Sequence, residues 1–227
     1  MKFRTINQVL KYAENYDTAN VNIDLSSNHI TTVDGLENIN CLSLILSYNE
    51  IENIPDNWNP ICDIVHMDNN KINYIGIGSF SNRYYAYINF SKNNINTINP
   101  LWRPTINKLI LTSNNITDIP SEIDITCNEL GLSFNKIKRL HNFPKIKCHC
   151  LDLTKNNITK IPDNFHVNCD IVDLGLNQIK HIPSSFSKTV NNHSPFVLYL
   201  DNNTKYYLVD FLVMPKKINN TIKTITI

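Results

Sequence analysis

Apolar and polar positions repeat along this chain with a period in the low twenties. Two apolar residues stand at −5 and −3 from each of a series of asparagines, and after all but the last asparagine apolar residues also stand at +2 and +5. The asparagines fall 21, 21, 23, 21, 21, 21, 21 and 26 residues apart, at Asn28, Asn49, Asn70, Asn93, Asn114, Asn135, Asn156, Asn177 and Asn203. A fixed period of this length indicates a solenoid, in which each turn buries its apolar face against its neighbours.

The apolar pair before each asparagine predicts a short β-strand. Leu151 and Leu153 are two residues apart with Asp152 between them, as a strand with one buried face requires. The same alternation precedes all nine asparagines, so it predicts nine strands stacked as a parallel sheet at about 4.8 Å per strand. Each asparagine carboxamide has a donor and an acceptor, and is expected to satisfy backbone groups of its own loop and of the next turn.

The second half of each repeat must return the chain to the start of the next strand. An Ile-x-x-Ile-Pro pattern follows Asn49, Asn114, Asn156 and Asn177. Proline disfavours a helix there, so the return is expected to be extended or a short 3₁₀ turn. A bulky residue near +9 predicts a second buried column, made of Leu36, Trp58, Phe80, Trp102, Ile123, Phe143, Phe165 and Phe186.

The pattern LxxLxLxxNxI resembles the leucine-rich repeat, and it covers roughly residues 20–204. The short period with Ile-Pro is similar to the compact repeats of bacterial effectors and of proteins from AT-rich organisms such as amoebae and giant DNA viruses. The resemblance implies a leucine-rich repeat horseshoe with a concave parallel sheet of about nine strands. It also implies a concave face of the kind that commonly binds proteins.

The segments outside the array are predicted to be caps. Residues 1–19 contain apolar residues at helical spacing (Ile6, Val9, Leu10 and Ala13), which predicts an N-terminal helical cap. Residues 205–227 form a C-terminal cap or tail. Its apolar stretch, Tyr206 to Met214, either covers the last core layer or leaves an edge that pairs with another chain.

Composition narrows the classes of partner. Charged residues make up 18% of the chain and the formal net charge is +1, so no basic excess favours nucleic acid or an acidic membrane. No apolar signal-like segment and no long apolar run is visible, which predicts an intracellular, cytoplasmic protein with no membrane partner.

Six cysteines invite a disulfide or a zinc site, but their register favours neither. Cysteine occupies the first, inward position of the repeat, eight residues before the asparagine, at Cys41, Cys62, Cys127, Cys148 and Cys169. We expect these thiols to behave as small buried hydrophobic groups in a reducing compartment. Cys150 should point outward instead. The Cys148-His149-Cys150 run, with His141 nearby, therefore cannot easily bind one ion, and no metal or cofactor is predicted.

Side chains that alternate with the buried ones should project from the concave sheet. Several are large and apolar or aromatic and have no structural role in the pattern, which suggests a contact surface with aromatic anchors. The predicted partner-binding residues are Ile45, Tyr48, Ile64, His66, Tyr87, Ile110, Phe134, Asp152 and Tyr199. His66 and Asp68 share a strand face, but no further catalytic group is fixed beside them, so no catalytic residues are predicted.

The favoured interpretation is a non-enzymatic protein–protein interaction module that acts as a monomer, with a protein partner of unknown identity. One alternative is a substrate-recognition component or effector that acts through a separate ubiquitin-ligase-type partner. Another is a structural, self-assembling protein whose C-terminal edge forms a dimer or larger particle.

Overall fold

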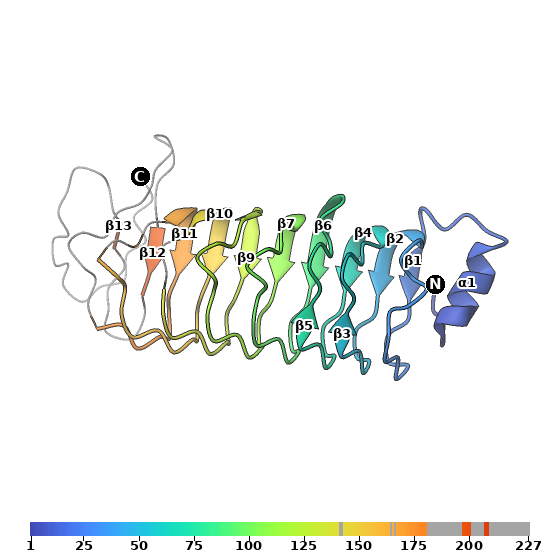
Figure 1. Cartoon of the computed structure of the whole chain (residues 1–227), viewed down its shortest axis with the longest axis horizontal. Coiled ribbons are helices and arrows are strands. Elements are labelled where there is room, and N and C mark those ends of the chain that lie inside the picture. Colours follow the sequence, from blue (N-terminus) through green and yellow to red (C-terminus); the bar gives the residue numbers. More distant parts are fainter. Residues whose placement is uncertain (141–142, 164, 166, 181–196, 201–206, 209–227) are drawn as a thin grey trace.

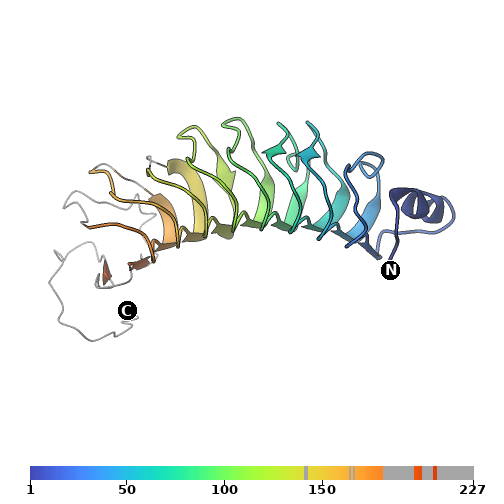
Figure 2. The ribbon, with the colours of Figure 1, turned by 90° about the horizontal axis from the view of Figure 1, so that it is seen from below.

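The chain forms a parallel β-solenoid in which each turn adds one strand to a continuous sheet (Figure 1). The computed structural model describes residues 1–140, 143–163, 165, 167–180, 197–200 and 207–208. The sheet lines the inner side of a shallow arc, and the return segments fan out on its outer side (Figure 2). The repeat-solenoid fold predicted from the sequence is confirmed.

The strands of the main sheet follow one another in chain order, and neighbours are parallel as far as β12. Their register equals one repeat, so that Leu44 lies opposite Val65 and Cys148 opposite Cys169. The last strand, β13, pairs with β12 in the antiparallel sense. The bounds are β1 (Asn22–Asp24), β2 (Asn40–Ile45), β4 (Ile61–His66), β6 (Tyr84–Asn89), β7 (Thr105–Ile110), β8 (Ile125–Thr126), β9 (Glu129–Gly131), β10 (Phe143–Asp152), β11 (Val167–Asp173), β12 (Val197–Tyr199) and β13 (Tyr207–Leu208).

The return segments are extended with turns, and the described residues contain no 3₁₀ helix. Two of the returns form a small outer parallel sheet from β3 (Asn53–Ile54) and β5 (Tyr74–Ile75). Directly after β5 the backbone of Gly76 approaches that of Pro55 so closely that a Cβ atom would lie 2.5 Å from the proline carbonyl. Glycine is therefore required where the 23-residue repeat crosses the preceding return.

The core consists of two buried columns that run the length of the arc. The first comprises the residues at −5 and −3 from each asparagine, all of which are 3% exposed or less in the described turns. The second lies under the outer face and confirms the predicted bulky residues at Leu36, Trp58, Phe80, Trp102, Ile123 and Phe165. The side chain of Phe143 and the whole of Phe186 lie outside the described residues.

The asparagines form a hydrogen-bonded ladder that runs across the turns at the C-terminal ends of the strands. Asn135 shows the pattern: its Oδ1 accepts from the backbone N–H of Ile116 at 3.0 Å, and its Nδ2 donates to the carbonyls of Leu111 and Leu132, each at 3.0 Å. Equivalent bonds recur from Asn49 to Asn177. The carboxamide therefore joins its own turn to the preceding one. A buried polar column of this kind is stable because its members are satisfied.

The N-terminal segment closes the first turn with a short extended piece and a helix. Phe3 donates its backbone N–H to the carbonyl of Asp24 at 2.7 Å, and its own carbonyl accepts from Asn28 Nδ2 at 2.8 Å. The helix α1 (Ile6–Ala13) begins after Thr5, whose side chain accepts from the N–H of Gln8. Its Val9 is fully buried. Hydrogen bonds and packing thus both cover the exposed end of the array.

Candidate interaction surface

The inner face of the sheet presents three rows of side chains that run across the strands. The first row contains Ser43, Ile64, Tyr87, Lys108, Glu129, Cys150 and Ile171. The second row contains Asp24, Ile45, His66, Asn89, Ile110, Gly131, Asp152 and Asp173. The third, which we call the left-handed row, consists of the residues directly before the asparagines: Ser27, Tyr48, Asn69, Lys92, Ser113, Phe134, Lys155 and Leu176.

Every member of the left-handed row has a positive φ, between 51° and 58°. None of them is glycine and none is β-branched, because a branched Cβ is strongly disfavoured in this conformation. The geometry turns the side chain away from the core. Tyr48 is 60% exposed, Phe134 49% and Leu176 42%. Bulky apolar groups are thus held in solvent at a position that packing does not require to be apolar.

The structure distributes the predicted binding residues over these rows. Tyr48 and Phe134 are exposed, and the others whose side chains are described are half-buried: Ile45, Ile64, His66, Tyr87, Ile110 and Asp152. Tyr199 lies in β12, but its side chain is outside the described residues. Of these residues, His66 and Tyr87 are in ring contact, with centroids 5.2 Å apart.

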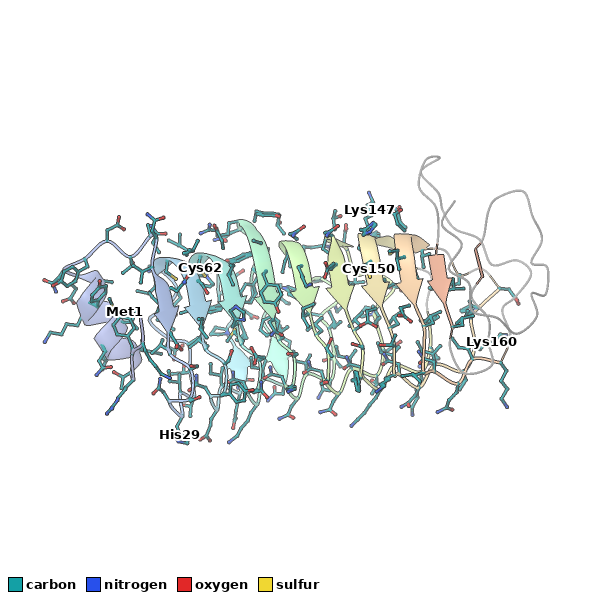
Figure 3. The ribbon with its side chains drawn as sticks, turned by 180° about the vertical axis from the view of Figure 1, so that it is seen from behind. Met1, His29, Cys62, Lys147, Cys150 and Lys160 are labelled. Atoms are coloured by element: carbon teal, nitrogen blue, oxygen red, sulfur yellow. The ribbon has the colours of Figure 1, made fainter. Side chains whose placement is uncertain are left out.

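Sequence reasoning missed three exposed apolar residues where the strands begin. Leu42 is 40% exposed, Ile61 41% and Tyr84 57%, and we call them the rim cluster. They come from β2, β4 and β6, the strands that also carry Ile45, Ile64 and Tyr87. The sequence contained a signal for Ile61 and Tyr84, because the same position holds a polar residue in other turns: Thr105, Thr126, Lys147 or Asn168. Figure 3 places Lys147 at this edge and His29 at the opposite one.

The rim cluster and the inner residues of the same strands lie on three neighbouring turns, from the start of the strands to the turn that carries Tyr48. We define the anchor surface as Leu42, Ile45, Tyr48, Ile61, Ile64, Tyr84 and Tyr87. An ion pair between Arg83 and Asp63, with Nη2 and Oδ1 3.0 Å apart, lies among its members. An exposed apolar patch bordered by polar groups is typical of a contact site.

The second predicted cluster, Ile110 and Phe134, is less available. A Cβ added to Gly131 would lie 3.1 Å from Ile110 Cδ1, so the isoleucine side chain lies over the glycine of the next strand. The Nζ atom of Lys155 lies 4.3 Å from the centroid of the Phe134 ring. A cation over the face of an aromatic ring is attracted to it, so Phe134 already has an intramolecular partner.

Towards its C-terminal end the second row contains two neighbouring carboxylates, followed by Tyr199 on β12. Asp152 on β10 and Asp173 on β11 are register partners, and Glu129 pairs with Lys108 one strand earlier. This ion pair, through its hydrogen bond, raises the pKa of Lys108. Burial raises the pKa of the half-buried Cys150, and the carboxylates of Asp152 and Glu129 add to the effect. The inner face therefore carries apolar side chains on β2, β4 and β6, and two adjacent aspartates on β10 and β11 with Lys155 on the turn after β10.

His66 and Asp68 do not form a dyad. The carboxylate of Asp68 accepts hydrogen bonds from Ser47 Oγ at 2.7 Å, Asn69 Nδ2 at 2.7 Å and Asn89 Nδ2 at 3.2 Å. The His66 ring packs on Tyr87 instead. Asp68 thus joins adjacent turns, which is a structural role, and His66 and Asp68 do not form the neighbouring pair that their shared strand face suggested.

The cysteines are free thiols. Cys41, Cys62, Cys148 and Cys169 are buried as predicted, whereas Cys127 is half-buried. The Sγ atoms of Cys148 and Cys169 are 3.0 Å apart, and hydrogen bonds with Cys127 and Cys169, together with burial, raise the pKa of Cys148. A hydrogen bond with Cys41 and burial raise the pKa of Cys62 as well, so Cys62 and Cys148 are protonated, weakly nucleophilic thiols, whereas the hydrogen bond with Cys62 lowers the pKa of Cys41.

The suspected metal cluster is divided between separate contacts. Cys148 lies against Cys169, and His149 Nδ1 is 3.0 Å from Asp170 Oδ2, while His141 lies outside the described residues. Across the described ranges, no three histidine, cysteine or acidic side chains are placed to hold one ion. Among the same residues, no helix has the length and apolar character needed to cross a membrane.

Comparisons with known proteins add little to this geometry. No protein-family model matches the chain, and no curated protein matches it. Among solved structures it is similar to a leucine-rich repeat protein of Leptospira interrogans, with 14% sequence identity and a TM-score of 0.22, over 82% of this chain and 79% of that chain. The description of the fold as a leucine-rich-repeat-type solenoid therefore rests on the strand order, the register and the asparagine ladder of this chain.

Proposed function

We propose that the protein is a non-enzymatic interaction module that binds a protein partner on its concave sheet, with the anchor surface as the centre of contact. A solenoid of this type holds a broad, rigid inner face, and such folds are generally protein-interaction modules. The observation that carries the proposal is the anchor surface itself. Its seven apolar or aromatic side chains come from three consecutive turns, and four of them are at least 40% exposed.

The backbone of the inner face offers no alternative mode of binding. The strands are paired on both sides from β2 to β11, so a partner cannot add a strand there and must contact side chains. Large aromatic groups on a rigid support are the usual energetic centres of protein interfaces. Tyr48 and Tyr84, at 60% and 57% exposed, are the two aromatic groups of the anchor surface that are available for such contacts without unfolding.

A matched pair of double variants tests this proposal. Tyr48→Ala with Tyr84→Ala removes the two aromatic anchors, and Ile77→Ala with Leu101→Ala removes exposed apolar groups from the return segments, where they are 40% and 62% exposed. Proteins crosslinked to the wild-type chain in its native cell are compared with those crosslinked to each variant by quantitative mass spectrometry. Thermal unfolding is recorded for all three.

The anchor variant should lose a specific set of partners while its melting temperature stays unchanged, and the return-segment variant should keep that set. Each aromatic anchor at the centre of an interface contributes about 2 kcal/mol or more, which corresponds to about a thirtyfold loss of affinity. If the return-segment variant loses the partners and the anchor variant retains them, the outer face is the binding face and the proposal is wrong.

The self-assembly alternative depends on Tyr206 to Met214. Within that stretch the structure describes the backbone of Tyr207 and Leu208, which pairs with Leu198 and Val197 of β12. The remainder lies outside the described residues, so a cap and a dimer edge both stay predictions. Light scattering after size-exclusion chromatography distinguishes a monomer from a dimer.

A further inference from the structure

We propose that Cys148 and Cys169 form an oxidative modification site, in which hydrogen peroxide converts the two thiols into a disulfide between β10 and β11, with Cys127 as the thiol that the peroxide reaches first. The proposal is independent of any partner on the concave face. Its basis is a row of three thiols on consecutive turns, of which Cys127 is half-buried and the other two are buried.

The two buried thiols are already placed for a bond. Cys148 and Cys169 are register partners in parallel strands, and the Cα atoms of such partners lie about 4.8 Å apart, inside the range of about 4.4–6.8 Å that a disulfide spans. Their Sγ atoms are 3.0 Å apart, so they need to approach by about 1 Å to reach the length of an S–S bond. Side-chain movement therefore suffices, and the strands keep their register.

Cys127 continues the row on the preceding turn and is its most accessible member. It follows Thr126, the register partner of Lys147, and its backbone N–H donates to the carbonyl of Lys147 at 2.9 Å. A hydrogen bond between the Cys127 and Cys148 thiols, a second one with Cys169, and burial raise the pKa of Cys148. Because Cys148 is protonated and screened from solvent, the half-buried Cys127 is where a peroxide enters the row.

The oxidation takes place in three balanced steps. The Cys127 sulfur attacks one oxygen of hydrogen peroxide, the O–O bond breaks, and Cys127 becomes a sulfenic acid while water leaves with the thiol proton. The Cys148 sulfur then attacks the sulfenic sulfur, an S–S bond forms, and the S–O bond breaks as the hydroxyl group leaves with the Cys148 proton as a second water. Finally, Cys169 attacks the Cys148 sulfur, and the released Cys127 takes up the Cys169 proton. Two thiols are oxidised and one peroxide is reduced to two waters.

The position of Cys148 in the middle of the row favours the last step. The turn that carries Cys127 lies on one side of β10 and β11 lies on the other, so the attacking and the leaving sulfur are on opposite sides of Cys148. Exposed disulfides are the more easily reduced ones. A bond between the buried Cys148 and Cys169 is therefore better protected from reduction than a bond that includes the half-buried Cys127.

The other end of the array provides a matched comparison within the same molecule. Cys41 and Cys62 are also register partners, and a hydrogen bond with Cys62 lowers the pKa of Cys41. Both side chains are buried, at 3% and 1% exposed. Their row continues with Asn20 on one side and the buried Tyr85 on the other, so the described structure places no accessible thiol beside this pair. It should resist peroxide if access through a third thiol is required.

Cys150 provides a second comparison, because it is a half-buried thiol that has no thiol next to it in its own row. Its register partners are Glu129 on β9 and Ile171 on β11. A sulfenic acid formed at Cys150 therefore has no neighbouring thiol to react with, and should stay available to a trapping reagent such as dimedone.

Treatment of the reduced, full-length protein with a small excess of hydrogen peroxide tests the proposal. Remaining thiols are blocked in denaturant, and disulfides are located by non-reducing peptide mapping with mass spectrometry. In the wild type the Cys148–Cys169 bond should form at least about tenfold faster than the Cys41–Cys62 bond. Cys127→Ser should slow the Cys148–Cys169 bond at least about tenfold, and the matched Cys150→Ser should change its rate less than about twofold.

A trapping experiment follows the first step directly. In Cys148→Ala the Cys127 sulfenic acid loses its neighbour, so dimedone should label Cys127 in this variant and much less in the wild type. Dimedone labelling of Cys150 should be the same in both proteins, which controls for the amount of peroxide. The melting temperature of each variant verifies that it is folded before oxidation.

Three outcomes would overturn the proposal. If Cys41–Cys62 forms as fast as Cys148–Cys169, which requires no variant to observe, access through Cys127 does not control the reaction. An unchanged rate in folded Cys127→Ser leads to the same conclusion. If a Cys127–Cys148 bond accumulates and persists, or if Cys127 is oxidised to a sulfinic acid without any disulfide, the transfer to Cys169 does not occur.

Discussion

Replacement of Asn135 by alanine tests the ladder that joins the turns. The substitution removes the bond from the N–H of Ile116 and the bonds to the carbonyls of Leu111 and Leu132, each at 3.0 Å, and of Ser133 at 3.2 Å. The Ile116 N–H loses its only partner in the described structure, whereas the three carbonyls keep a second donor in Asn114 Nδ2, Asn156 Nδ2 and the Ser113 N–H. A buried group left unpaired costs about 1–3 kcal/mol. The carbonyls that keep a second donor add about 1 kcal/mol in total, so we expect a loss of about 2–4 kcal/mol in the free energy of unfolding.

The control for this prediction is Asn28→Ala at the start of the ladder. Within the described structure the Asn28 side chain makes one hydrogen bond, from Nδ2 to the carbonyl of Phe3 at 2.8 Å. The expected loss is about 1 kcal/mol, the net contribution of a single bond. Urea denaturation followed by circular dichroism measures both variants, with the slope m checked for a change in the unfolding transition. Equal losses would refute the argument, because they would show that leaving the Ile116 N–H unpaired costs no more than losing one ordinary hydrogen bond.

An isosteric variant adds a pH test. In Asn135→Asp a carboxylate would face the carbonyls of Leu111 and Leu132, which now accept from Nδ2. Only the protonated acid can donate a hydrogen bond there, so the folded-state pKa of the introduced carboxyl group should be raised above its unfolded value. The variant should therefore lose stability as the pH rises through the unfolded and then the folded pKa, and regain it on acidification. A stability unaffected by pH, relative to wild type, would contradict this account.

Three further predictions concern thiols, tryptophans and glycines. Cysteine labelling in the native state, read by mass spectrometry, should be slowest at the buried Cys41, Cys62, Cys148 and Cys169, intermediate at Cys127 and fastest at Cys150. The labelling rate of Cys150 should rise toward alkaline pH, because burial raises the pKa of its thiol. Stoichiometric zinc or a native disulfide would contradict this prediction. In urea denaturation, Trp102→Phe should destabilise the protein by about 1 kcal/mol more than Trp58→Phe. The reason is that Trp102 Nε1 donates a hydrogen bond to the Ser79 carbonyl at 2.8 Å, whereas the buried Trp58 Nε1 has no partner. Equal losses would show that this hydrogen bond is not stabilising. Gly76→Ala should lower the free energy of unfolding by more than about 2 kcal/mol, because the new Cβ would lie 2.5 Å from the Pro55 backbone. Gly35→Ala should lower it by only about 1 kcal/mol, the effect of the positive φ, since the nearest contact is the Leu10 side chain at 3.4 Å. Similar melting temperatures for the two variants would refute the steric argument.

The fold could be predicted from the sequence because the same pattern of apolar residues and asparagine recurs in each turn. Once the hydrogen bonds of Asn114 fix the turn after the strand, strand alternation places Leu109 and Leu111 on the buried face. The expected direction of the ladder was wrong: the carboxamide bonds the preceding turn and not the next one, because its donor and acceptor can serve either neighbour. The outer sheet of β3 and β5 was also missed, because its pairing depends on Gly76, whose close approach to Pro55 is visible only in three dimensions.

The candidate surface was only partly predictable. Alternation correctly turned Tyr48 out of the core, but it does not distinguish Phe134, whose ring carries the Lys155 ammonium, from a ring open to a partner. Leu42, Ile61 and Tyr84 lie where the strand begins, outside the alternating positions, so a rule of two-residue periodicity passes over them. Among the asparagines, Asn203 lies outside the described residues.

The asparagine ladder also has a consequence for the order in which the turns fold during synthesis. Because Asn49 Oδ1 accepts from Ile30 N–H and Asn70 Oδ1 from Ile51 N–H, each turn is completed by a side chain synthesised about one repeat later. On the ribosome, the most recently emerged turn always lacks its acceptor until the next one follows. Folding during translation should therefore trail synthesis by one turn, and protection of these isoleucine amides from hydrogen exchange in stalled chains should advance in steps of one repeat.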